Sequence, residues 1–332
     1  MDESTSHLEN SLAQTKFFAS ETAESKHRAI NDLARMSKKG TEIAELKYRP
    51  KKKLDQKEEF CLGETLSRAQ QKLVELGLPD PQRKLPQRWQ LHFFNNHKKI
   101  DDVYVSELST GIAFFVPKGM ALSDTKFQYT IYHELAHYVN KTVVKIVPKS
   151  ESKKGLRAHS FGFNRYTRTS ADNEEAIEEG GDLVMRGIYD EPAADLFAMY
   201  CIDDDKQTIE TNYALQLPFL MCLLKEYAAV KGITALEAFK QLFVAKTQQD
   251  FGFQRELAKV FGKRFVRGIN NIVVSTVCHS GVKDAALLVA LSGEGKFNQS
   301  FGALLEDVRR GESFSFPGIK TKAVRTKIPY EF

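Results

Sequence analysis

No apolar run in the sequence approaches the roughly 20 residues that a membrane-spanning helix needs, so we expect no transmembrane segment. The chain begins MDESTSHLEN, which lacks the basic start and apolar stretch of a secretory signal peptide. Both absences favour a cytoplasmic protein. Delivery by a specialised secretion route is compatible with the same features.

Cysteine is scarce and scattered. The four cysteines, Cys61, Cys201, Cys222 and Cys278, lie far apart in the sequence. This spacing argues against a disulfide framework and favours a reducing compartment. Cys201 and Cys222 fall in stretches that we expect to be apolar helices, where cysteine usually packs as a small buried hydrophobe.

Hydrophobic residues, by contrast, are plentiful. They make up 42% of the chain and include 23 phenylalanines, which is enough for a packed core. The composition therefore predicts a mainly globular protein. The 332 residues allow two domains of ordinary size, or one domain with terminal additions.

Positive charge is concentrated in one stretch. Residues 26–57 hold eleven Lys and Arg against four Asp and Glu, a local charge of +7, whereas the whole chain carries +5. We therefore predict a polar, basic and flexible arm over residues 1–57, whose charge is solvated. The alternative is a contact of residues 26–57 with nucleic acid or an anionic membrane surface. No aromatic interleaving or known nucleic-acid module accompanies the charge, so we favour the solvated arm.

Order is expected to begin near Phe60. Apolar residues at helical spacing predict a helix over residues 64–76, which Gly77 can end. Aromatic and β-branched runs then predict strands over residues 88–94, 103–105 and 111–116, the last two joined as a hairpin.

A second helix is expected after Ser123 or Asp124. Its apolar positions, Phe127, Ile131, Leu135 and Val139, recur every four residues. Periodicity is weak between residues 141 and 190. Further helices are predicted over residues 191–201, 207–230, 235–248, 254–268, 282–291 and 300–310. The expected fold class is therefore α+β, with a mainly helical C-terminal half.

The motif that carries chemistry is His-Glu-Leu-Ala-His at residues 133–137. On a helix, residues four apart differ by only about 40° in azimuth, so His133 and His137 face the same side. Two imidazoles so placed can hold one Zn²⁺, and Glu134 lies beside them, where it can take a proton from a metal-bound water.

The third metal ligand decides the class of enzyme. A metzincin has Gly and His three and six places after the second histidine, but here these places hold Asn140 and Val143, which excludes that class. Glu191 is the favoured ligand because it starts an apolar helix, where an unpaired carboxylate would be costly. Asp195, one turn further, would accept a hydrogen bond from a ligand histidine.

A second group of carboxylates competes for the same role. Glu175, Glu178 and Glu179 lie in a run rich in acids, which is more typical of a solvated face. They remain alternative metal ligands at this stage.

His133-Glu-Leu-Ala-His137, followed by Glu191-x-x-Ala-Asp195, resembles the gluzincin superfamily of zinc metallopeptidases. The second element is similar to the ligand helix of membrane-embedded HtpX-type peptidases. The stretch from Glu178 to residue 198 also looks like the catalytic domain of lethal-factor-type toxin proteases. The resemblance implies one zinc ion held by His133, His137 and Glu191, with Glu134 as the general base.

The resemblance also implies a zincin-like core over residues 58–204, made of a backing helix, a small mixed sheet and the active-site helix. Residues 205–332 would then form a helical subdomain. No tyrosine or histidine aligns as the oxyanion stabiliser. Tyr189 and His159 are candidates only because they are near in sequence.

We therefore expect a zinc-dependent endopeptidase that hydrolyses protein or peptide substrates with a metal-activated water. The strand over residues 111–116 would lie beside the cleft and offer a free edge to an extended substrate. One alternative is a catalytically silent regulator or partner-binding module with a zincin fold, although an intact Glu134 argues against it. Another is a toxin or effector protease that acts in a target cell.

Overall fold

The structure of the chain is a computed structural model. It describes residues 52–78, 80–81, 85–96, 104–108, 111–147, 156–161, 165–168, 183–186, 189–202, 208–211, 216–248, 250–271, 296–310, 312–319 and 323–326. The predicted arm over residues 1–57 lies almost entirely outside these ranges. None of the helices in the described part is long and apolar enough to span a membrane.

The first described helix, α4 (Gln56–Glu75), begins eight residues earlier than predicted. Polar residues mark its start: the Asp55 side chain accepts from the Glu58 amide, and the Glu58 side chain accepts from the Asp55 amide. This reciprocal pair is a capping box, which stabilises a first helical turn without apolar residues. The helix ends before Gly77, as predicted, where φ is +86°.

A small mixed sheet follows, after a 3-10 turn at Arg88–Gln90. It consists of β1 (Leu91–Asn96), β2 (Tyr104–Leu108) and β3 (Gly111–Pro117) in the order β1-β3-β2. The strand β3 pairs with β2 in antiparallel fashion, which confirms the predicted hairpin, and with β1 in parallel fashion.

The prediction that residues 111–116 offer a free edge is wrong. Because β3 lies between β1 and β2, both of its edges are already hydrogen-bonded. Successive side chains of β3 point to opposite faces of the sheet. Phe114 stacks on Phe93 on one face, and Phe115 stacks on Phe94 on the other. A central strand can therefore pack large apolar residues on both of its faces.

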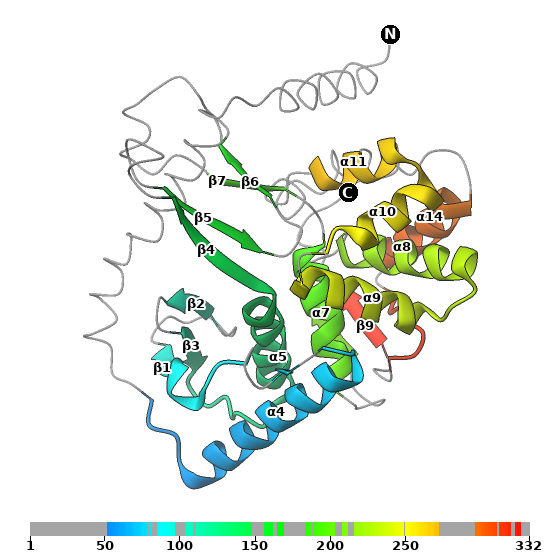
Figure 1. Ribbon diagram of the computed structural model, residues 1–332. Coiled ribbons are helices and arrows are strands. Elements are labelled where there is room, and N and C mark those ends of the chain that lie inside the picture. Colours follow the sequence, from blue (N-terminus) through cyan, green and yellow to red (C-terminus); the bar gives the residue numbers. More distant parts are fainter. Residues whose placement is uncertain are drawn as a thin grey trace.

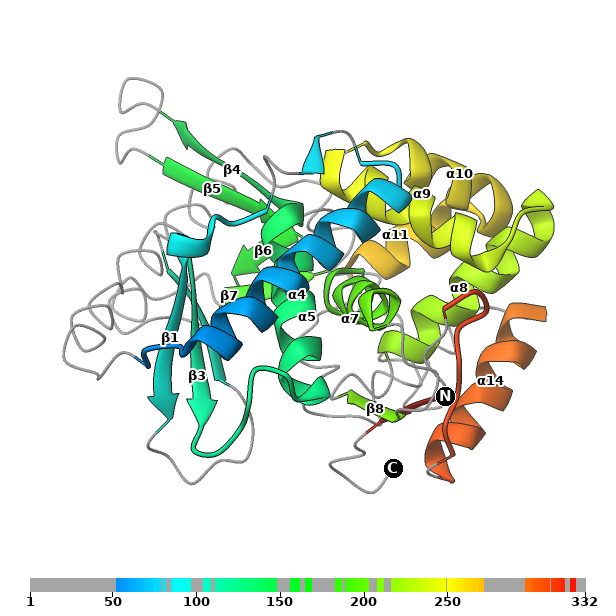
Figure 2. The same cartoon turned by 90° about the horizontal axis from the view of Figure 1, so that it is seen from below.

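Two helices carry the candidate site. The helix α5 (Thr125–Asn140) buries the predicted apolar positions 127, 131, 135 and 139, and α7 (Asp190–Cys201) is buried over almost its whole length. Ala193, Ala194 and Ala198 of α7 have no exposed surface, and their short side chains add little bulk to the helix. The two helices pack directly against each other, and α4 lies across them, as Figure 2 shows.

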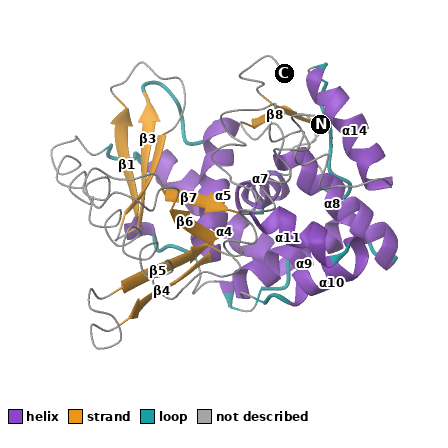
Figure 3. Ribbon diagram, turned by 90° about the horizontal axis from the view of Figure 1, so that it is seen from above, coloured by secondary structure: helices purple, strands orange, loops and turns teal. Residues whose placement is uncertain are grey.

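Between α5 and α7 the chain forms strands that the sequence did not predict. β4 (Lys141–Val147) pairs with β5 (Leu156–Phe161), and β6 (Arg165–Arg168) pairs with β7 (Leu183–Arg186), both antiparallel. Most strands lie on one side of the molecule and most helices on the other (Figure 3).

The C-terminal part is mainly helical, as predicted (Figure 1), and its described residues include a small parallel pair of strands. Its elements are β8 (Thr208–Thr211), α8 (Gln216–Lys231), α9 (Ala235–Gln248), α10 (Gly252–Phe261), α11 (Lys263–Asn271), α14 (Lys296–Arg309) and β9 (Ala323–Thr326). β8 pairs with β9.

Two of the predicted helices differ from these elements, and a third cannot be compared with them. The helix over 207–230 was wrong at its start, because the chain first forms β8. The helix over 254–268 is two helices, since Gly262 has φ +89° and interrupts the helical backbone. The helix over 282–291 lies outside the described residues. The described chain as a whole is α+β, and one hydrophobic core contains residues from Leu62 to Ile319.

Candidate metal centre

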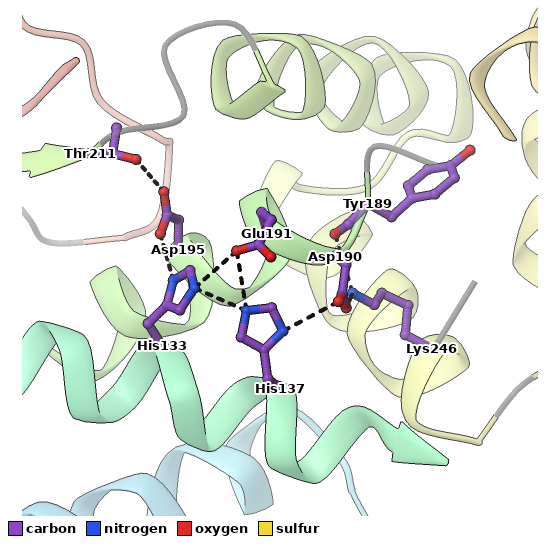
Figure 4. A network of polar contacts seen from close by, with 8 residues as sticks. All are labelled: His133, His137, Tyr189, Asp190, Glu191, Asp195, Thr211 and Lys246. Atoms are coloured by element: carbon purple, nitrogen blue, oxygen red, sulfur yellow. Dashed lines mark hydrogen bonds and ion pairs between the residues drawn. The ribbon is translucent and has the colours of Figure 1, made fainter. Parts of the chain in front are cut away.

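His133 and His137 project from α5 toward α7, where Glu191 meets them (Figure 4). The two Nε2 atoms lie 2.9 Å apart. Glu191 Oε2 lies 3.2 Å from His133 Nε2 and 3.3 Å from His137 Nε2. Three potential ligand atoms thus form a nearly equilateral triangle.

Each histidine is held from behind by an aspartate of α7. His133 Nδ1 lies 2.7 Å from Asp195 Oδ1, and His137 Nδ1 lies 3.3 Å from Asp190 Oδ2. Ionised carboxylates only accept hydrogen bonds, so each Nδ1 carries the proton and donates it. In the unprotonated form of both rings, the Nε2 atoms point lone pairs at each other and at Glu191. Such a convergence of electron pairs is unfavourable without a cation between them.

Helical geometry explains why one short segment supplies all three acids. Glu191 and Asp195 are one turn apart, and Asp190 precedes Glu191 by about 100° around the helix axis. The three carboxylates therefore occupy one side of α7, facing α5. Apart from the partly exposed Tyr200, the remaining side chains of this helix are apolar and buried, which fixes the orientation of that acidic side.

Burial makes these charges strongly dependent on one another. His133, Asp190 and Asp195 expose only 8%, 4% and 1% of their surface. Burial by itself lowers the pKa of His133, but hydrogen bonds to Asp195 and Glu191 outweigh it and raise the pKa to about 9. In the metal-free protein, Asp195 and Glu191 therefore favour the protonated, positively charged form of His133.

Glu191 responds in the opposite direction. Burial would raise the pKa of its carboxyl, but the charge on His137 and the hydrogen bond to His133 hold that pKa well below its usual range. The carboxylate is thus ionised and available as a ligand over the whole physiological range.

A zinc ion fits this donor set. With Zn–N and Zn–O distances of about 2.0–2.1 Å, two ligand atoms of a tetrahedral site lie about 3.3 Å apart. The three observed separations of 2.9, 3.2 and 3.3 Å are close to that value. Among the described residues, His133, His137 and Glu191 form a group that could hold a metal ion.

Comparisons with known proteins add no relative. Searches of family models, curated proteins and solved structures found no match.

The structure describes the side chains of some of the other predicted site residues and not those of the rest. Glu134 lies on α5 beside His133 and is partly exposed. Tyr189 is fully buried, and Figure 4 shows its ring directed away from the two histidines. This orientation does not suit an oxyanion stabiliser. The side chains of the other candidates, His159, Glu175, Glu178 and Glu179, lie outside the described residues.

Sequence reasoning missed several supporting residues. Asp190 was overlooked although it directly precedes the favoured ligand. Thr211 of β8 donates its hydroxyl hydrogen to Asp195 Oδ2, and Lys246 of α9 contacts Asp190. Tyr129 lies one turn before His133, where burial and the nearby Asp195 carboxylate raise the pKa of its phenol well above the usual value. A repeat of the four-residue spacing upstream of His133 could have indicated Tyr129, but nothing in the sequence links Thr211 or Lys246 to the motif.

Proposed function

We propose that the chain is a zinc-dependent endopeptidase of the gluzincin type, with zinc held by His133, His137 and Glu191. The observation that carries the proposal is the convergence of three ligand atoms whose separations suit one tetrahedral zinc ion. The spacing His-Glu-x-x-His supports it independently, because a site that only bound zinc would not need Glu134.

Zinc, when bound, lowers the pKa of a water molecule and polarises a carbonyl group. The protein residues supply the rest. Asp195 and Asp190 keep the protons of the two imidazoles on Nδ1, so that both Nε2 atoms remain electron-pair donors. Glu134 takes a proton from the attacking water at its carboxylate and passes it to the leaving amine.

The partly exposed position of Glu134 suits this role. A general base must reach both the water and the leaving group, whereas the supporting aspartates are almost completely buried. The different roles of these acids follow from their burial. The buried Asp190 and Asp195 orient the two histidines, and the more accessible Glu134 transfers protons.

The test combines metal analysis with a search for cleaved proteins. Purified wild-type protein should contain about one zinc ion per chain, and the His133→Ala/His137→Ala double variant should contain none. Proteomic mapping of new N-termini in a cell lysate should reveal cleavage by the wild type. The Glu134→Gln variant should retain zinc and lose this cleavage by several orders of magnitude.

Two results would contradict the proposal. Full zinc content in the double histidine variant would show that the metal is bound elsewhere. Cleavage by Glu134→Gln within about tenfold of the wild type would show that Glu134 is not the base. Zinc binding without any detectable cleavage by the wild type would favour a regulatory or partner-binding protein.

A further inference from the structure

Lys246 is a fully buried lysine whose ammonium group faces the metal centre. It lies in the last turn of α9 and has no exposed side-chain surface. Its Nζ is 2.8 Å from Asp190 Oδ1 and 3.2 Å from the carbonyl oxygen of Tyr189 (Figure 4). A buried ammonium is costly unless it is paired, so its position needs a reason.

The reason lies in the second oxygen of the same carboxylate. Asp190 uses Oδ1 for Lys246 and Oδ2 for His137 Nδ1. The ammonium group therefore restrains the carboxylate in the rotamer that reaches the histidine. Its positive charge also balances the buried carboxylate of Asp190.

The other histidine has a different support. Asp195 places Oδ1 on His133 Nδ1 and receives the hydroxyl of Thr211 on Oδ2. Each orienting aspartate is thus restrained by a side chain from the C-terminal part of the chain. His133 is backed by a neutral hydroxyl, whereas His137 is backed by a full positive charge.

A neighbouring contact places α9 firmly against the active-site helix. Thr247 Oγ1 lies 2.8 Å from the side chain of Asn140, the last residue of α5 and three residues after His137. Both residues are buried. The last turn of α9 therefore contacts the end of one ligand-bearing helix and the start of the other.

We propose that Lys246 is a positioning residue of the metal centre, which acts through Asp190 to fix the orientation and electron-donating strength of His137. This inference rests on the proposed zinc site. It also makes α9 part of that site, so that residues 58–204 by themselves lack Lys246 as well as Thr211.

The experiment compares Lys246→Met with Lys240→Met, the same substitution at a more exposed lysine of α9. Zinc affinity is measured by competition with a chelator, and the geometry of the site is followed in the visible spectrum of Co²⁺-loaded protein. Circular dichroism at low temperature establishes the folded fraction. Lys246→Met should raise the zinc dissociation constant about 10–100-fold and alter the Co²⁺ bands, as expected for the loss of a ligand's outer partner. Lys240→Met should change neither.

A double-mutant cycle separates this role from general stability. In the Asp190→Asn background, Lys246→Met should weaken zinc binding no further, because the carboxylate through which Lys246 acts has been replaced by an amide. If Lys246→Met does not fold, Lys246→Gln, which keeps a hydrogen-bond donor, replaces it in every measurement.

The outcomes are distinguishable. A folded Lys246 variant with wild-type zinc affinity and an unchanged Co²⁺ spectrum overturns the inference and leaves the zinc site standing. An equal loss of affinity in the wild-type and Asp190→Asn backgrounds also overturns it. Failure of the wild-type protein to bind either metal overturns the proposed function, and this inference with it.

Discussion

At the scale of single residues, Glu191 differs from its acidic neighbours in what it touches. It is the acid within 3.3 Å of both Nε2 atoms, whereas Asp195 and Asp190 contact the Nδ1 atoms. Glu191→Ala should therefore abolish zinc binding almost completely, and Asp195→Ala should weaken it about 10–100-fold. Zinc titration against a chelator measures both effects.

The same titration with Glu175→Ala tests the competing ligand. We expect this variant to bind zinc like the wild type. Loss of zinc in Glu175→Ala, together with normal binding in Glu191→Ala, would transfer the third ligand to the acidic run before α7.

The raised pKa of His133 makes the metal-free protein sensitive to pH. A group whose pKa is raised on folding, here from 6.5 to about 9, stabilises the fold fully below pH 6.5 and loses this contribution as the pH rises through 9. In excess chelator the melting temperature should fall between pH 6.5 and 9. Zinc affinity should rise over the same range, because zinc and protons compete for the same nitrogen.

Asp195→Asn is the matched variant for this measurement. It keeps the size of the side chain but removes a charge that raises the pKa of His133, so the fall in melting temperature should become smaller. If the melting temperature of the chelated wild-type protein rises from pH 6.5 to 9, the raised pKa of His133 does not govern its stability in this range.

How much of the site could be predicted depends on how far apart in sequence its interacting residues lie. His133, Glu134 and His137 are tied by a local helical spacing, and Asp195 is tied to Glu191 by the same rule. Lys246 is 56 residues from Asp190 in sequence and carries no local pattern that distinguishes it from a surface lysine. Only the packing of α9 against α7 brings the two together.

At the scale of elements, α7 packs against α5 and α8 and also contacts α9. Phe197 stacks on Phe243 of α9 with ring centroids 5.1 Å apart, and both rings are fully buried. Phe197→Ala should destabilise the protein by about 3–5 kcal/mol, since it removes a large core side chain and leaves a cavity. Urea unfolding of the chelated protein measures this loss.

Phe60→Ala is the control for this change, because Phe60 is 66% exposed. Its effect should lie within about 0.5 kcal/mol. A similar destabilisation by both substitutions would show that α7 is not buried as the structure has it.

The elements that could be predicted are those with their own start and stop signals. The helix over residues 235–248 was predicted with the bounds that the structure has, because apolar spacing fills it from end to end. The break at Gly262 was missed because residues on both sides keep helical spacing. The central place of β3 was missed because a strand's neighbours are decided by pairing between distant segments.

At the scale of the whole molecule, the beginning of the ordered chain can be tested by truncation. Lys52 already belongs to the folded structure: its amide donates to the Phe93 carbonyl of β1 at 2.9 Å, and its ammonium lies 2.6 Å from Glu58. Asp55 then caps α4. A chain that starts at Lys51 should therefore match the full chain in stability and zinc content.

A chain that starts at Glu58 should be less stable by about 1–2 kcal/mol, since it loses the cap and the contact with β1. Urea unfolding of both truncated chains and of full-length Asp55→Ala measures the difference, and the substitution should reproduce the capping part of it. Zinc content should be unchanged in all three, because Asp55 and Lys52 contact neither α5 nor α7 through any hydrogen bond that the described residues make. Loss of the folded state in the chain starting at Lys51 would show that residues 1–50 belong to the packed structure and are not a dispensable arm.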